Sequence, residues 1–262
     1  MNLDKFTITS YDELIGFDRV TGSLDMILDE LNDFTMSQEE EKVDITGKGG
    51  RTIGSLKKNK KVTGKGTNGM LSGGALAAML GSDVEDGEYE IRYTDTIVVT
   101  SNKGTTKETA LGTVGNEIGT IYVRDESKAY ISGGKKLTQV ATTPASTGEF
   151  SYDPSTKEIS FYEGDVVDGT EIIAFYDAKV SGKKITNDAD KYSKTLKVFL
   201  NVTCTDGCDN IFFGQFIIDR ADFNGTFDIA GGSDPSTLGF EFTSLPDLCT
   251  AKSDLWDFII FE

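Results

Sequence analysis

Seven basic side chains gather in one stretch of the sequence, residues 45–82, which contains no Asp or Glu. They are Lys48, Arg51, Lys57, Lys58, Lys60, Lys61 and Lys65. The whole chain carries a formal charge of −17, so the 19 basic and 43 acidic residues outside the stretch sum to −24. A molecule with one positive segment on a negative body attracts copies of itself head to tail. These seven residues are therefore predicted to make contacts between subunits rather than to catalyse a reaction.

A simpler interpretation stays open, in which the stretch is a surface loop whose lysines only face water. An exposed ion pair contributes about 0–1 kcal/mol by itself. Several such pairs repeated around a ring of copies can set register and orientation, and exposed strand edges can add sheet pairing between neighbours. The charge pattern favours contact between copies over the solvated loop.

The residues that most catalytic sites require are missing. The chain has no histidine, which excludes Ser-His-Asp and Cys-His arrangements and most catalytic zinc sites. The cysteines are three in number, which favours free thiols and leaves a small Cys204–Cys208 disulfide as the alternative, with Cys249 unpaired. Neither Lys48 nor Lys65 completes a phosphate-binding G-x-x-x-x-G-K-[ST] loop.

Acidic clusters at residues 83–90 and 188–190 do not match a calcium-binding loop, so they are expected to be solvated turns. No spacing marks out a carboxylate pair for glycoside hydrolysis. We therefore expect no enzyme, no cofactor and no metal site. The acidic balance also argues against nucleic-acid binding, and the sequence shows no apolar run long enough for a membrane span and no signal peptide.

The hydrophobic pattern predicts a mainly β protein, a β-sandwich or β-barrel of about ten strands. From residue 88 onward, short runs alternate with period two, and residues 150–162 form the clearest hairpin, around Asp153-Pro154-Ser155-Thr156. A second hairpin is expected to turn at Asp206-Gly207. Residues 24–31 fit either a helix or a strand, and residues 39–41 are expected to form a solvated turn.

One short helix is predicted at about residues 72–80, with Ser72 as its N-cap and Gly81 at its end. Its Leu76, Met79 and Leu80 are expected to dock on a sheet, since so short a helix is not stable alone. Residues 47–69 are rich in Gly, Asn and Lys and predict a long protruding loop or hairpin. We expect a single domain over residues 1–262, with about 100–150 as an insertion.

The succession of a strand, a glycine-basic loop and a short helix within residues 39–82, with its pattern NG…LSGG.LA…G, resembles the N-terminal part of bacteriophage tail tube (major tail) proteins. Residues 174–232 are similar to later strands of that family, with the run from Arg220 to Asp228 matching an R/K-A-x-x-x-G-x-F-D segment. Together these regions cover about 100 residues, and the resemblance does not extend to the middle, about 100–150.

The resemblance implies a structural virion protein that forms rings, usually hexamers, stacked into a hollow conduit for DNA ejection. It implies contacts with other copies and with terminator, sheath or tape-measure proteins, and DNA passing through the lumen without specific binding. Its location would be the virion tail, after assembly in the host cytoplasm. Two alternatives remain: a virion decoration or capsid-surface protein with an immunoglobulin-like sandwich, and a carboxylate-based glycosidase.

Overall fold

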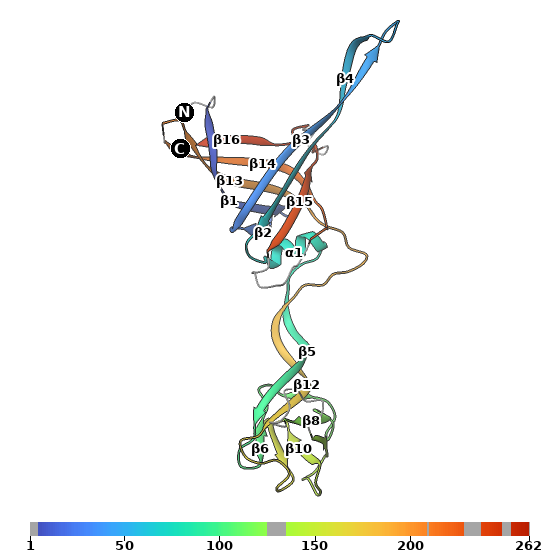
Figure 1. Ribbon diagram of the computed structural model, residues 1–262, viewed down its shortest axis with the longest axis vertical. Helices are drawn as coiled ribbons and strands as arrows, with labels where there is room; N and C mark the ends of the chain where they lie inside the picture. The colour runs from blue at the N-terminus through green and yellow to red at the C-terminus, as the bar shows by residue number, and fades with distance from the viewer. Residues whose placement is uncertain (1–4, 125–134, 209, 228–236, 248–252, 262) are drawn as a thin grey trace. The chain divides into compact units, whose positions relative to one another are not determined.

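The computed structural model describes residues 5–124, 135–208, 210–227, 237–247 and 253–261, which form two compact units (Figure 1). Unit 1 comprises residues 1–85 and 184–262, and unit 2 comprises residues 86–183. Each unit has one eight-stranded sheet and one hydrophobic core of its own. The stretch of about 100–150 that the sequence suggests as an insertion falls within unit 2.

Unit 1 has the strand order β2-β1-β13-β14-β15-β4-β3, with β16 also paired to β14. Alternating residues of its long strands, such as Leu196, Val198 and Leu200 of β13, are fully buried. Tyr11 of β1 packs against Phe34 of β3, with ring centroids 5.4 Å apart, so the sheet curls until its ends approach each other. The elements of unit 1 are β1 (Phe6–Asp18), β2 (Leu24–Leu28), β3 (Leu31–Thr46), β4 (Thr52–Asn68), α1 (Gly73–Leu80), β13 (Thr195–Asp206), β14 (Ile211–Phe223), β15 (Leu238–Ser244) and β16 (Asp257–Phe261).

Unit 2 has the strand order β5-β12-β8-β9-β10-β11-β6, with β7 paired to β12. Its core is centred on Tyr176 and Phe150, both fully buried. The Tyr176 hydroxyl donates to Asp95 Oδ2 at 3.1 Å, and burial raises the pKa of this tyrosine to about 12. The strands are β5 (Glu85–Val98), β6 (Lys103–Thr105), β7 (Ala110–Leu111), β8 (Thr120–Val123), β9 (Lys136–Gln139), β10 (Glu149–Asp153), β11 (Glu158–Phe161) and β12 (Glu171–Lys184).

The helix α1 covers the predicted residues and has the predicted ends. Ser72 Oγ accepts a hydrogen bond from Ala75 N at 3.4 Å, and Gly81 stops the helix with a φ of +67°. A Cβ on Gly74 would lie 2.4 Å from the carbonyl oxygen of Asp25, so this glycine lets the helix lie directly on β2. The face that docks differs from the prediction: Ala75, Ala78 and Met79 are buried, whereas Leu76 and Leu80 are only partly so.

The mainly β class and the single short flanking helix are confirmed in the described residues. These residues form sixteen strands, more than the ten or so expected, because several strands of unit 2 are only two to four residues long. Both predicted hairpins are present, as β10–β11 and β13–β14. Residues 24–28 are a strand, in which Met26 and Leu28 are buried and Ile27 between them is exposed, with the period of two that a strand requires. Leu24 lies beyond a shift in the pairing with β1 and is exposed.

Candidate assembly surface

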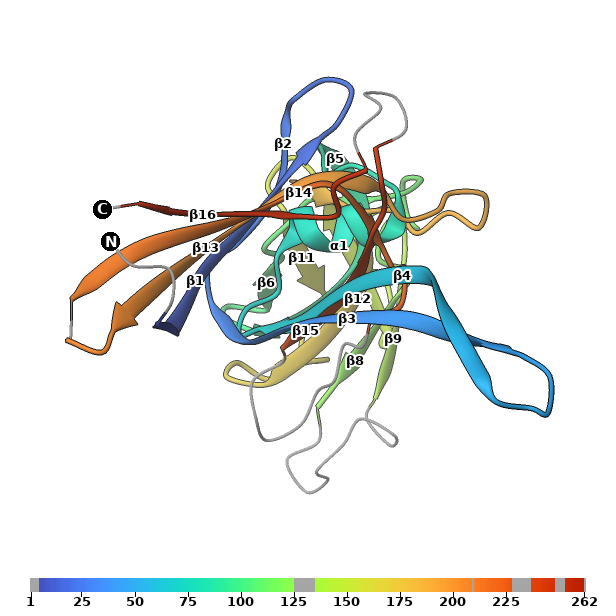
Figure 2. The ribbon, with the colours of Figure 1, turned by 90° about the horizontal axis from the view of Figure 1, so that it is seen from above.

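The predicted basic segment is mostly the second strand of a long hairpin. Strands β3 and β4 pair from Leu31 with Asn68 to Thr46 with Thr52, and in Figures 1 and 2 they continue past the other strands of unit 1. We call residues 39–61, the distal half of this hairpin, the arm. Its tip is a tight turn in which Gly47 N donates to Arg51 O at 2.8 Å. Gly49 and Gly50 adopt φ values of +81° and +76°, which explains the glycines there.

The structure brings six of the seven predicted basic residues together on the arm. Lys48 and Arg51 lie in the tip, and four lysines lie along β4, at positions 57, 58, 60 and 61. Lys65 stands apart, on the part of β4 that pairs with β15, where it borders a hollow of about 490 Å³ with Asp33 and Glu241. All seven side chains are exposed.

Part of this positive charge is neutralised within the arm. Lys57 Nζ lies 2.8 Å from Glu40 Oε1, and Lys58 Nζ lies 3.2 Å from Glu41 Oε1. The hydrogen bond and charge of Lys57 hold the pKa of Glu40 below its usual value, and Glu40 raises the pKa of Lys57. The prediction that residues 39–41 form a solvated turn was wrong, since they are part of β3 and face the lysines of β4.

A β-bulge at Asn59 sets which side chains share a face of the arm. The pairing shifts by one residue between Glu39–Lys61 and Glu41–Lys58, and Asn59 has a φ of +54°. Its Nδ2 donates to Glu41 Oε2 at 2.7 Å, which holds the bulge. Beyond the bulge, Val43 of β3 lies directly opposite Leu56 of β4, on the same face of the hairpin.

This face of the arm is apolar, a feature that the sequence analysis missed. Val43, Ile45 and Leu56 lie on this face and are all exposed, Leu56 to 57%. Ile53, exposed to 62%, lies beside them at a second shift in the register, between Ile45 and Thr46. The alternation of Val43 and Ile45 was the available signal, but their partner on β4 depends on the bulge. The arm therefore combines apolar contact area with a net charge of +3, from seven basic and four acidic residues between 39 and 61.

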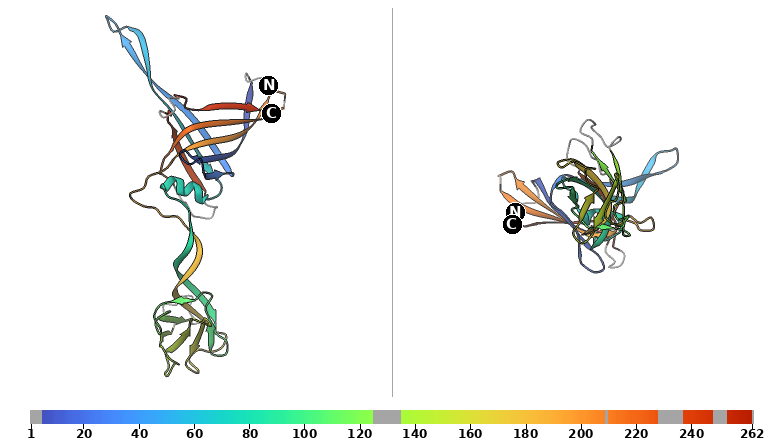
Figure 3. Two further views of the ribbon diagram at one scale, coloured as in Figure 1. Left: turned by 180° about the vertical axis from the view of Figure 1, so that it is seen from behind. Right: turned by 90° about the horizontal axis from the view of Figure 1, so that it is seen from below.

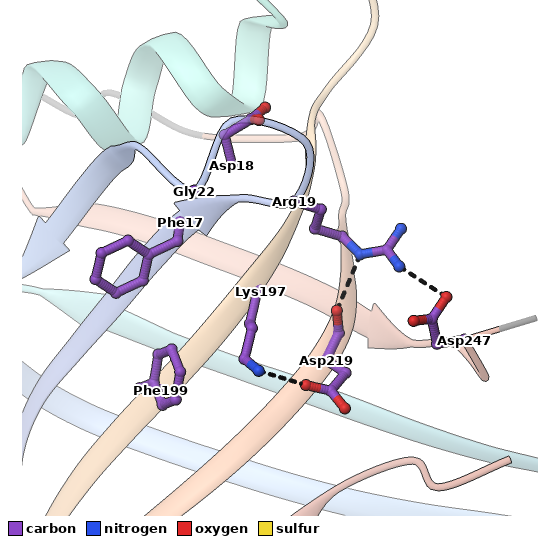
Figure 4. A pocket seen from close by; sticks show the side chains of 8 residues that line it. All are labelled: Phe17, Asp18, Arg19, Gly22, Lys197, Phe199, Asp219 and Asp247. Carbon is purple, nitrogen blue, oxygen red and sulfur yellow. Dashed lines mark hydrogen bonds and ion pairs between the residues drawn. The ribbon is translucent and has the colours of Figure 1, made fainter. Parts of the chain in front are cut away.

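A second feature of unit 1 is a shallow hollow of about 450 Å³ beside β1, β13 and β14, shown in Figure 4. Phe17 and Phe199 meet edge to face, and Lys197 Nζ lies 5.3 Å from the Phe199 ring centroid. Charges in the hollow pair with one another: Lys197 contacts Asp219 at 2.8 Å, and Arg19 contacts Asp247 at 2.8 Å (Figure 4). These pairs neutralise two of the three carboxylates that line the hollow, those of Asp219 and Asp247.

Among the described residues, no three His, Cys, Asp or Glu side chains lie close enough together to hold a metal ion. Cys204 and Cys208 are both free thiols, so the alternative of a disulfide between them was wrong. Burial raises the pKa of the Cys204 thiol. Cys249 lies outside the described residues. In the part of the chain that the structure covers, no helix is long and apolar enough to cross a bilayer.

A model of the YomU/Tube protein family matches residues 6–256, nearly the full length of the chain. The chain belongs to this family. The YomU/Tube family is a tail tube family, so the resemblance to bacteriophage tail tube proteins is confirmed. A search of the curated proteins found no match.

Membership in the YomU/Tube family gives the chain a structural role in a phage tail tube and implies a non-enzymatic protein. A tube is built from repeated copies, so the family also implies self-assembly together with other tail proteins, in the virion tail. The match includes the whole arm.

Proposed function

We propose that the protein is the tail tube subunit, which assembles into rings of six that stack into a hollow conduit for DNA ejection. Its further partners are the terminator, sheath or tape-measure proteins at the ends and surfaces of the tube. Family membership over residues 6–256 carries this proposal. It gives the tube role, and the arm supplies a means by which one copy reaches the next.

The seven predicted basic residues keep their proposed role as inter-subunit contacts, but they are not equally available to a neighbouring copy. In the described part of the chain, Lys48, Arg51, Lys60, Lys61 and Lys65 take part in no ion pair within 4.0 Å, unlike Lys57 and Lys58. The unpaired charges at the tip are those most available to an acidic neighbouring copy. The chain's net charge of −17 supports a lumen that repels DNA phosphates, so that DNA slides through without specific binding.

Residues 1–262 remain, in this proposal, one tail-tube-like domain, with residues 47–69 forming the tip and second strand of the arm's hairpin. Unit 2 is then an elaboration inserted between Glu85 and Lys184, and it includes the stretch of about 100–150. The strands that enter and leave the insertion, β5 and β12, pair with each other, and ion pairs of Lys184 with Glu85 and of Lys183 with Asp86, at 3.0 and 2.9 Å, lie at this point.

Negative-stain electron microscopy of the purified protein at low and high salt tests the proposal. Rings or tubes are expected, with fewer or shorter assemblies as salt screens the charged contacts. The double variant Lys48→Glu with Arg51→Glu should impair stacking more than Lys57→Glu with Lys58→Glu, because the latter lysines already have partners on the arm. Discrete monomers or trimers under every condition would instead favour a virion decoration protein.

A further inference from the structure

A second exposed apolar surface lies on strands β14 and β16. Phe213 pairs with Phe261 across these strands, with ring centroids 6.2 Å apart, and Ile211 and Ile259 lie on the same face. All four side chains are exposed, Ile211 to 68%. The alternate residues Phe212 and Phe216 point into the core, so the four exposed ones point away from it. We call these four residues the β14–β16 face.

The β14–β16 face and the tip of the arm lie on opposite sides of unit 1. In Figure 2 the arm extends to the right, whereas the free ends of β13, β14 and β16 extend to the left. Both views in Figure 3 show the same separation. Since both elements belong to unit 1, this separation does not depend on the position of unit 2. The arm of one molecule therefore cannot cover its own β14–β16 face, but it can reach that of another copy.

The charges around the two surfaces are complementary. The arm carries a net +3. Residues 198–219 and 253–262, which contain β16 and most of β14, include no Lys or Arg. Their acidic residues include Asp206, beside the end of β14, and Asp254 and Asp257, at β16. An exposed apolar area of this kind with a charged rim is typical of a protein–protein contact.

We propose that the apolar face of the arm, with Val43, Ile45 and Leu56, docks on the β14–β16 face of a second copy of this chain. The contact joins two different surfaces of the same protein, so it is heterologous and repeats from copy to copy. Burial of the apolar side chains holds the copies together, and the basic tip and acidic rim guide their approach. This inference rests on the proposed function and adds to it the acceptor and the apolar nature of the contact.

The acceptor can be identified by photo-crosslinking the full chain. Leu56→benzoylphenylalanine is introduced in unlabelled chains, which are mixed with unaltered ¹⁵N-labelled chains under assembly conditions and irradiated. Trypsin leaves β16 and most of β14 in two peptides, since no Lys or Arg lies within residues 198–219 or 253–262. Crosslinks from position 56 to these labelled peptides are expected. Crosslinks only to other labelled peptides, or only within one copy, would overturn the proposal.

Paired substitutions then test whether the two surfaces meet. Leu56→Glu and Phe213→Lys, each alone, are expected to abolish tube growth, and copies carrying both are expected to recover it at low salt. Both side chains are exposed, so the fold should persist, which circular dichroism checks for each variant. Val20→Glu is the matched control, because Val20 is 93% exposed but lies in the turn after β1, away from both surfaces.

The salts used in assembly separate this inference from the broader proposal. Sulfate strengthens apolar burial, so tubes of the unaltered protein should persist in ammonium sulfate, although sodium chloride slows their formation. If the unaltered protein forms tubes but Leu56→Glu and Phe213→Lys do so equally well, the docking inference fails and the tube function stands. If the unaltered protein forms neither rings nor tubes, both fail.

Discussion

Lys57 Nζ lies 2.8 Å from Glu40 Oε1, on the facing strand of the same hairpin. Part of the basic segment is thus already paired with acidic residues of its own hairpin, and these lysines are less available to another molecule. The remaining charge of the arm is small, and four exposed apolar side chains lie beside it. Exposed ion pairs are individually weak, so the cohesion of a tube is better explained by apolar contact, with charge providing orientation.

The Glu40–Lys57 pair predicts a measurable titration. Carboxyl ¹³C shifts should give Glu40 a pKa below 4.5, its usual value, and Lys57→Gln should raise it toward 4.5. Because the folded pKa is lowered, the pair stabilises the arm above pH 4.5, and this contribution is lost as the pH falls through the folded pKa. Lys60→Gln is the control, since Lys60 acts on Glu40 only at a distance and should shift it less. Equal shifts in the two variants would contradict the assignment.

Two glycines of β4 predict unequal losses of stability from the same substitution. A Cβ on Gly64 would lie 2.3 Å from Cζ of Phe242, which is fully buried and cannot move aside. Gly64→Ala should therefore destabilise unit 1 by about 1–3 kcal/mol in urea unfolding, as overpacking does. Gly54→Ala is the matched control on the arm, where the nearest atom, Ile45 Cδ1, is 3.9 Å away. Its effect should stay within about 0.5 kcal/mol, and an equal loss in both variants would disprove the packing argument.

Local signals in the sequence predicted the local structure well. Ser72 and Gly81 gave the two ends of α1, and Asp153-Pro154 gave the turn between β10 and β11. Period-two alternation gave the class of the fold. These features depend on neighbouring residues, and such signals can be read from one sequence.

The assembly surface could be predicted only in part, because it depends on pairing between distant residues. The lysines of residues 57–61 were recognised, but their pairing with residues 39–41 requires the register of β3 on β4. The bulge at Asn59 decides that Leu56 joins Val43 on one face, and a shift of one residue would put it on the other. The β14–β16 face likewise exists only because residues 257–261 pair with residues 213–217.

Tyr176 predicts how unit 2 responds to alkali. The hydroxyl of Tyr176 has a pKa of about 12 in the folded protein and of 10.0 in the unfolded chain. As the pH rises, the unfolded chain therefore loses this proton at a lower pH than the folded protein does. Unit 2 should therefore lose stability above pH 10. Absorbance near 295 nm should show one tyrosine ionising at about pH 12 or on unfolding, and Tyr176→Phe should remove that step. Tyr192→Phe, at an 84% exposed position, is the control and should leave it in place; loss of the step in both variants would contradict the assignment.

The separate cores of the two units predict that unit 2 can be removed. No residue of the unit 1 core belongs to the unit 2 core, and the chain enters and leaves unit 2 at residues joined by the ion pairs Glu85–Lys184 and Asp86–Lys183. A chain in which a short Gly/Ser linker replaces residues 86–183 should keep a cooperative urea transition, because the core that stabilises unit 1 is intact. If unit 2 is an elaboration, this shortened chain should also form tubes in electron micrographs.

The shortened chain with Gly64→Ala is the control. It should unfold at a lower urea concentration, which shows that the urea transition reports on the core of unit 1. A shortened chain without a cooperative transition would show that unit 1 depends on the insertion, and a folded one that forms no tubes would assign unit 2 a part in assembly.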